Sequence, residues 1–146
     1  MSTTYISAAL RRQVIERADN LCEYCLIHEN DTFFGCHIDH IVSEKHGGAT
    51  EPDNLALACT FCNLHKGSDI GSFAPNGGLT RFFNPRSDLW HNHFVLSEAR
   101  IIPISDIGEV TARIFQFNAR ERILERMALM EIGHYPHKAA RERMEQ

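Results

Sequence analysis

Two pairs of cysteines with the same short spacing constrain this chain of 146 residues more than any other feature. The first pair is Cys22 and Cys25, and the second is Cys59 and Cys62. Two residues separate the cysteines of each pair, so both thiolates of one tight turn can bind the same metal ion. Two such turns supply the four ligands that tetrahedral Zn²⁺ prefers, and four thiolates close its coordination sphere. The sequence therefore predicts a structural zinc ion, with buried core cysteines or a redox pair as the disfavoured alternative.

Composition and the absence of long apolar stretches indicate one globular domain over residues 1–146. The hydrophobic share is 43% and the charged share 23%, which is ordinary for a globular protein. No apolar stretch is long enough to cross a bilayer, and the first residues lack the apolar core of a secretion signal. We therefore expect a cytoplasmic protein without a membrane partner, where reducing conditions favour metal thiolates over disulfides.

The segment between the two cysteine pairs predicts a hairpin followed by a short helix. Residues 33–38 form one expected strand, which continues to Val42, and residues 55–58 form its return strand. A Gly-Gly turn at residues 47–48 separates them. Thr60 is the expected N-cap of a helix over residues 61–66, ended by a glycine.

The rest of the chain predicts an α+β fold around this hairpin. Ser7 is a suitable N-cap for a helix that runs to about Ala18. The later elements are expected, in chain order, as a strand at 79–83, a hairpin at 93–96 and 100–104, a helix from Ser105 or Asp106 to about 117, and a helix from Asn118 to about 132. The charged tail, residues 136–146, is expected to be only partly ordered.

Three polar residues at the hairpin and the short helix have the chemistry of phosphodiester hydrolysis. This reaction needs a base for water, a cation on the phosphate and a stabilised leaving oxygen. His40 can take the proton from water, and the oxygen donors of Asp39 and Asn63 suit Mg²⁺ or Mn²⁺. Adjacent residues of a regular strand point to opposite sides, so we expect a bend at Asp39 and His40.

The order of short motifs around these residues resembles the HNH endonuclease family of the ββα-metal fold. The motifs are Asp39-His40-Ile41-Val42, His46-Gly47-Gly48, Asn54-Leu55, and Cys59-Thr60-Phe61-Cys62-Asn63 followed by Lys66. The resemblance covers about residues 20–70 and implies a ββα-metal core with a structural zinc, an extension at about 71–135 packed on it, and the same roles for Asp39, His40 and Asn63. It also implies that Asn54 holds the backbone near His40. The last position is often His in the family and is Asn63 here, so the resemblance leaves the metal preference open.

Several other residues near these motifs have two readings each. Asn54 could instead be an ordinary turn asparagine. Lys66 either contacts a phosphate or is a surface lysine at a helix end. His37, His46 and His65 either contact the metal or the phosphate, or are solvated or packed histidines.

The charge of the chain gives mixed indications about whether the protein binds nucleic acid. The net charge is −4, and residues 1–70 carry 5 Lys and Arg against 10 Asp and Glu. A binder of phosphates normally has an excess of basic residues, although a bound divalent cation reduces that need. Candidates for contact with the DNA backbone, or else members of solvated ion pairs, are Arg81, Arg86, Arg113, Arg120, Arg122 and Arg126.

Together the sequence predicts an endonuclease that cuts DNA by water attack and, by analogy with the family, leaves 5′-phosphate and 3′-hydroxyl ends. A zinc-stabilised nucleic-acid-binding module without catalysis is one alternative. An RNA-directed nuclease with the same site is another.

Overall fold

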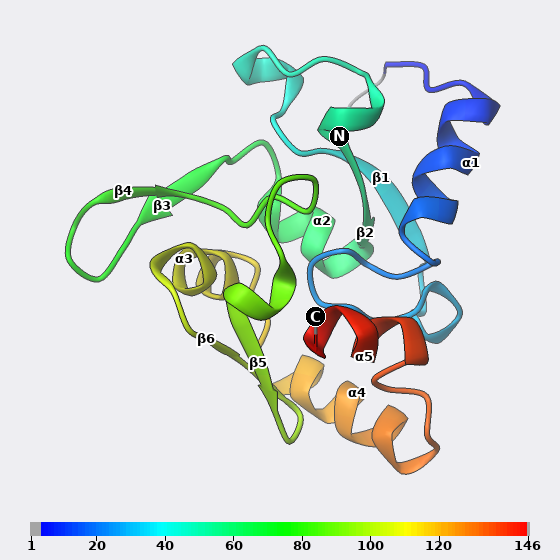
Figure 1. The fold of residues 1–146 in the computed structure, drawn as a ribbon, viewed down its shortest axis with the longest axis vertical. Helices are drawn as coiled ribbons and strands as arrows, with labels where there is room; N and C mark the ends of the chain where they lie inside the picture. The colour runs from blue at the N-terminus through cyan, green and yellow to red at the C-terminus, as the bar shows by residue number, and fades with distance from the viewer. Residues whose placement is uncertain (1–3, 146) are drawn as a thin grey trace.

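The computed structural model describes residues 4–145, which form an α+β fold of short helices and two-stranded antiparallel sheets (Figure 1). The pairs of strands are β1–β2, β3–β4 and β5–β6, and single 3₁₀ turns lie between several elements. The elements are α1 (Ala8–Arg17), β1 (Cys36–His40), β2 (Leu55–Cys59), α2 (Thr60–Lys66), β3 (Gly71–Phe73), β4 (Leu79–Arg81), β5 (Phe94–Ser97), β6 (Arg100–Pro103), α3 (Asp106–Ile114), α4 (Arg120–Glu131) and α5 (Lys138–Glu145).

The β1–β2 hairpin has the predicted order but a shorter first strand. Asp39 pairs with Ala56 and His40 with Leu55, so the strand ends at His40. Its predicted start at residue 33 is wrong, because Gly35 has a positive φ of 73° that interrupts the extended backbone. Phe33 before it is 90% exposed. The chain therefore enters the hairpin from a turn, and the strand is only as long as the segment that carries the candidate residues.

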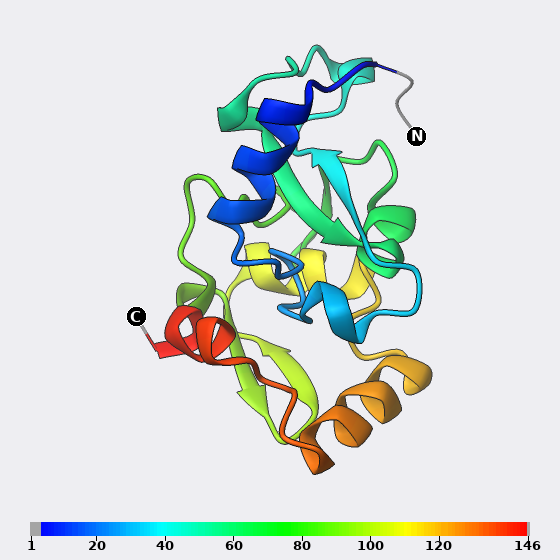
Figure 2. The same ribbon diagram turned by 90° about the vertical axis from the view of Figure 1, so that its right-hand side faces the viewer.

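Helix α1 packs on the β1–β2 hairpin at one end of the molecule, while α4 and the β5–β6 hairpin lie at the other end (Figures 1 and 2). The predicted cap is confirmed, since the Ser7 side chain accepts a hydrogen bond from Leu10 N at 3.1 Å. Val14 of α1 and Leu57 of β2 belong to one buried apolar cluster, which excludes water from this side of the hairpin. Helix α1 therefore supports β2, the strand that pairs with β1.

Helix α2 begins one residue earlier than predicted. Its N-cap is Cys59, whose sulfur accepts a hydrogen bond from Cys62 N at 3.4 Å. The expected cap, Thr60, is the first helical residue, and its hydroxyl lies 2.9 Å from His37 Nε2. Gly67 ends the helix with a φ of 53°, as predicted.

The C-terminal extension contains the predicted hairpin and two helices with small differences at their ends. Ser105 caps α3 by accepting a hydrogen bond from Gly108 N. Ala119, not Asn118, is the N-cap of α4. The Asn118 amide instead exchanges hydrogen bonds with the backbone of Ile101 in β6, so a tertiary contact replaces the expected cap. The strand expected at 79–83 ends at Arg81, and its partner β3 was not predicted, because it begins with a glycine in a segment rich in turn-forming residues.

The described part of the tail expected to be only partly ordered contains a helix. Lys138–Glu145 forms α5, with Ala140 buried and Met144 packed against the core. These two residues are four apart and share one helix face, which offsets the charged composition of the segment. Gln146, the last residue of the predicted tail, lies outside the described residues.

One hydrophobic cluster contains residues from both the hairpin region and the C-terminal extension. Its aromatic members include Tyr24, Phe94, Phe115 and the single tryptophan, Trp90. Trp90 Nε1 donates to the Tyr24 carbonyl oxygen at 2.8 Å, so the loop between the first cysteines rests on the extension. Across residues 4–145, no helix has the length and apolar character needed to cross a membrane.

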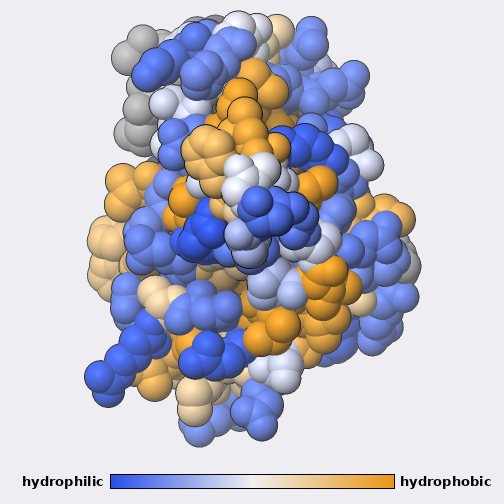
Figure 3. All heavy atoms as spheres, turned by 90° about the vertical axis from the view of Figure 1, so that its left-hand side faces the viewer, coloured by the Kyte–Doolittle hydropathy of each residue, from blue (hydrophilic) through white to orange (hydrophobic). Residues whose placement is uncertain are grey.

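Some apolar side chains remain on the surface. The face in Figure 3 shows them in several separate patches among polar residues. Phe73 of β3 and Leu79 of β4 are exposed in this way on the β3–β4 hairpin. Scattered exposure of this kind is normal for a globular protein and indicates no function by itself.

Candidate active site and metal centre

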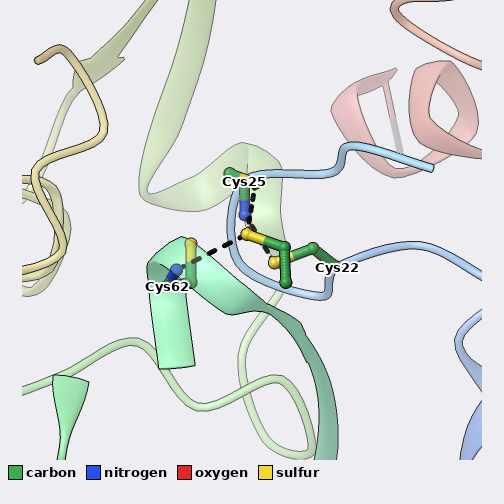
Figure 4. Close-up of side chains that lie close together, drawn as sticks. Cys22, Cys25 and Cys62 are labelled. Carbon is green, nitrogen blue, oxygen red and sulfur yellow. Dashed lines mark hydrogen bonds between the residues drawn. The ribbon is translucent and has the colours of Figure 1, made fainter. Parts of the chain in front are cut away.

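The four cysteines of the two pairs lie together in the interior of the molecule. Their sulfur atoms are all within 4.8 Å of one another, and all four residues are buried. Cys22 and Cys25 lie on the loop after α1, and Cys62 lies in the first turn of α2 (Figure 4). No disulfide joins them. The predicted four-cysteine cluster is therefore confirmed.

The donors and their spacing fit zinc. Zn–S bonds of about 2.3 Å in a tetrahedron place the sulfur atoms about 3.8 Å apart. The Cys25 and Cys59 sulfurs lie 3.7 Å apart. Burial raises the pKa of Cys22 and Cys62, so four buried thiolates require positive charge close by. The residues present could hold a zinc ion with no open position.

His40 lies at the end of β1 and is 7% exposed. Its Nε2 atom lies 2.8 Å from the Thr50 hydroxyl and 4.0 Å from Glu44 Oε1. Both neighbours come from the loop between β1 and β2. A hydrogen bond on one ring nitrogen fixes the orientation of the imidazole and leaves the other nitrogen for a second partner.

Asp39, the residue before it, is 6% exposed and interacts with two side chains. Its Oδ2 atom accepts a hydrogen bond from the Tyr24 hydroxyl at 3.1 Å, and the Lys66 amine lies 3.4 Å away. Burial raises the pKa of Asp39, and the positive charge of Lys66 opposes that rise. A carboxylate with a cation beside it in the interior is held in one orientation.

The alternative reading of Lys66 as a surface lysine is wrong, because the side chain is 2% exposed. Contact with a phosphate stays a prediction. The Lys66 amine donates to the His40 carbonyl oxygen at 2.9 Å as well as to Asp39. Lys66 therefore ties α2 to the end of β1, where Asp39 and His40 lie.

Asn54 makes more contacts than an ordinary turn asparagine. Its Oδ1 atom accepts from Val42 N, and its Nδ2 atom donates to the Val42 and Ala49 carbonyl oxygens, each at 2.9 Å. The same turn requires Gly48, because a Cβ there would lie 1.7 Å from the Val42 carbonyl oxygen. The Asn54 amide therefore fixes the loop that follows His40, as the family resemblance implies.

Asp39, His40 and Asn63 all line one pocket of about 760 Å³. Asp39 and His40 are adjacent in the chain and both pair in register with β2, so the expected bend at the strand end stays a prediction. Asn63 reaches it from α2, and no described residue forms a hydrogen bond with its side-chain amide. Two residues that carry oxygen donors and one that carries an imidazole thus line the same space.

Further residues of this pocket have no sequence signal of their own. Arg11 of α1 and Lys45 of the loop after β1 line it and supply positive charge, and Glu44 supplies a carboxylate. Arg11 lies almost thirty residues before the motif, so only the packing of α1 on the hairpin brings it to the site. Thr50 is the unforeseen partner of His40, in a loop whose composition shows only a turn.

The three neighbouring histidines differ in position. His37 lines the pocket and lies within hydrogen-bond distance of the Thr60 hydroxyl. His65 interacts with the Phe61 carbonyl oxygen and stacks on the Phe61 ring. His46 is exposed in the turn after β1. Of the three, only His37 is among the residues that line the pocket.

Most of the arginines considered for DNA contact instead make contacts within the protein. Arg122 and Arg126 are each 3% exposed, so the predicted solvated helix face is wrong for them. Buried apolar neighbours and backbone carbonyls replace solvent around both guanidinium groups. Three of the others form ion pairs, namely Arg81 with Asp88, Arg86 with Glu23, and Arg113 with Glu109, while Arg120 is exposed.

Comparison with known protein families matches residues 22–69 to the family described as HNH endonuclease. The match begins at the first cysteine of the cluster and includes the whole β1–β2 hairpin and α2. No curated protein and no solved structure matches the chain significantly.

Proposed function

We propose that residues 22–69, which match the HNH endonuclease family, make this chain a metal-dependent nuclease that hydrolyses DNA phosphodiester bonds. The observation that carries the proposal is the shared pocket of Asp39, His40 and Asn63. A base next to two oxygen donors is the arrangement that hydrolysis of a phosphodiester needs, and a pure binding module does not need it.

His40 is the general base in this proposal. Thr50 holds Nε2, so Nδ1 is the nitrogen to which we assign the proton of the attacking water. The Asn54 hydrogen bonds keep the following loop in place, which fixes the position of the imidazole. General-base catalysis of this kind contributes about 10²- to 10⁴-fold to a rate.

Asp39 and Asn63 would hold the divalent cation. Their hard oxygen atoms suit Mg²⁺ or Mn²⁺, ions that keep several waters and bind substrate phosphates directly. When bound, such a cation neutralises charge on the phosphate and the leaving oxygen. Lys66 keeps the Asp39 carboxylate in one orientation and, as a buried cation, offsets part of its charge.

The substrate assignment rests on charge around the pocket as well as on the family. Arg11 and Lys45 line the same space and can contact phosphates on either side of the cleaved bond. We assign the cytoplasm as the setting, because reducing conditions preserve four zinc thiolates. Cleavage of RNA and binding without cleavage are the outcomes that would replace DNA hydrolysis.

The test is a cleavage assay with the zinc-loaded full chain on plasmid DNA and on RNA. Each substrate is incubated with Mg²⁺, with Mn²⁺ or with EDTA, and the zinc content is measured after the EDTA arm. His40→Ala is compared with His46→Ala, which changes an exposed histidine that is not among the residues lining the pocket. We expect metal-dependent cutting of DNA that His40→Ala abolishes and His46→Ala preserves.

DNA that is bound but stays intact with every metal would replace the proposal with a non-catalytic binding module. Cutting of RNA alone would replace it with an RNA-directed nuclease.

A further inference from the structure

A buried arginine of the C-terminal extension contacts the cysteine cluster. Arg122 lies in the first half of α4, and its Nη2 atom is 3.4 Å from Cys62 Sγ and 3.7 Å from Cys59 Sγ. Both distances are within the range of an N–H donor to a sulfur acceptor. None of the ion pairs found across residues 4–145 involves Arg122, so the sulfur atoms are its nearest anionic partners there.

The remaining contacts hold this guanidinium in place. Its Nη1 atom donates to the Phe115 carbonyl oxygen at 3.0 Å. The Phe61 ring centroid lies 5.2 Å from its central carbon, and the Phe117 centroid lies 5.9 Å away. Aromatic faces attract a cation, and they also exclude water from it. The side chain is therefore fixed with one edge toward the cysteines.

The negative charge of a zinc ion bound by four thiolates explains why a guanidinium lies beside the cysteine cluster. Four thiolates around one Zn²⁺ leave two uncompensated negative charges, and the four cysteines are buried. A buried charge is costly without a partner of opposite sign. A guanidinium remains charged in any protein environment and can donate two hydrogen bonds in one plane.

We propose that Arg122 is the counter-ion of the zinc centre, through which the metal fastens the C-terminal extension to the nuclease core. The inference rests on the zinc site and not on nuclease activity. Hydrogen bonds from Arg122 lower the electron density on Cys59 and Cys62 and slow the loss of zinc. The Tyr135 hydroxyl adds a second link, since it donates to the Cys25 carbonyl oxygen at 2.9 Å.

Arg126 is a matched control on the same helix. It is as buried as Arg122 and lies one turn further along α4. Its guanidinium donates to the carbonyl oxygens of Ala99 and Phe117 and makes no contact with a cysteine sulfur among the described hydrogen bonds. Substitution of Arg126 therefore removes a buried arginine and its packing without removing a hydrogen bond to a cysteine sulfur.

The experiment compares Arg122→Gln with Arg126→Gln in the zinc-loaded full chain. Zinc release to a chromogenic chelator is followed at a temperature well below the unfolding midpoint of both variants. Loss of a hydrogen-bonded neighbour of a metal ligand weakens metal binding about 10- to 100-fold. We expect faster zinc release of that size for Arg122→Gln and a rate near that of the parent protein for Arg126→Gln.

Cobalt substitution supplies a readout that loss of packing does not change. A thiolate that no longer accepts a hydrogen bond is a better electron donor, so the sulfur-to-cobalt charge-transfer band should move to lower energy in Arg122→Gln. It should stay in place in Arg126→Gln. If Arg122→Gln does not fold, the pair Arg122→Lys and Arg126→Lys replaces it, and only the first should release zinc faster.

Equal zinc-release rates in the Arg122 and Arg126 variants would overturn the proposal, as would an unchanged cobalt band in the Arg122 variant. Nuclease assays do not enter this test, so a chain without DNA cleavage would leave the counter-ion role standing.

Discussion

Replacement of Lys66 by Met should destabilise the protein strongly, although the two side chains have similar length. The Lys66 amine lies 3.4 Å from the Asp39 carboxylate, and both groups are buried. Two unit charges at that distance attract by about 5 kcal/mol at an effective dielectric constant near 20. The cost of removing both charges from water offsets part of this attraction. Loss of the lysine alone leaves a buried carboxylate without its cation, so we expect the free energy of unfolding to fall by about 3–5 kcal/mol.

A double-mutant cycle with Asp39→Asn isolates the ion pair from the other contacts of Lys66. Each single change leaves one charge unpaired, whereas Lys66→Met combined with Asp39→Asn leaves none. The double variant should therefore lose less stability than the sum of the two single losses, by about 2–3 kcal/mol. The assay is urea unfolding of zinc-saturated protein, followed by the fluorescence of the single, buried Trp90.

The pH dependence of the Lys66→Met variant has a defined sign. Burial raises the pKa of Asp39, and removal of Lys66 takes away the charge that opposes the rise. A carboxyl whose pKa is raised in the folded state stabilises the fold while protonated and loses that contribution as pH rises through the folded pKa. The stability deficit of Lys66→Met should therefore shrink as pH falls through the raised pKa of Asp39, with zinc content monitored. A loss below about 1 kcal/mol, or additive single losses, would refute the buried ion pair.

Four further changes have equally specific outcomes. Cys59→Ser should lower bound zinc and the unfolding temperature together, and a folded variant with full zinc content would contradict the metal assignment. Asn54→Ala removes three hydrogen bonds and should cost about 3 kcal/mol in urea unfolding, whereas a turn asparagine would cost under 1 kcal/mol. Gly48→Ala places a Cβ 1.7 Å from a carbonyl oxygen and should prevent soluble expression; normal yield would exclude that clash. Burial alone would raise the pKa of Asp88, but hydrogen bonds from Arg81 and the Asn84 backbone lower it. The stabilising effect of Arg81, measured as the unfolding difference from Arg81→Met, should therefore disappear as pH falls through the lowered pKa.

The sequence predicts the cysteine cluster and the shared pocket because both depend on short-range spacing. Each cysteine pair forms one turn, and the antiparallel pairing of β1 with β2 places Cys36 opposite Cys59 at the base of the hairpin. Asn63 follows Cys62 directly, so the position of the cysteine cluster determines the position of this candidate metal ligand. Local patterns of this kind can be recognised in a single sequence.

The surroundings of the site depend on contacts between distant segments, which no local pattern contains. The burial of Lys66 results from Tyr24 and Asp39, which come from two earlier parts of the chain. The basic residues around Arg122 suggest a solvated helix, yet its guanidinium faces sulfur atoms some sixty residues away. In both cases a charged side chain is buried because a specific partner is present, and periodicity alone predicts exposure.

The single-turnover rate of cleavage of a labelled DNA duplex tests the central claim most directly. Zinc-loaded parent protein and His40→Ala are compared at saturating Mn²⁺, with equal zinc content and equal unfolding temperatures as the conditions for comparison. The account predicts metal-dependent cleavage by the parent protein and a rate at least about 100-fold lower for His40→Ala, as expected for loss of a general base. Equal rates for the two proteins, or no cleavage by a parent protein that binds the duplex, would contradict it.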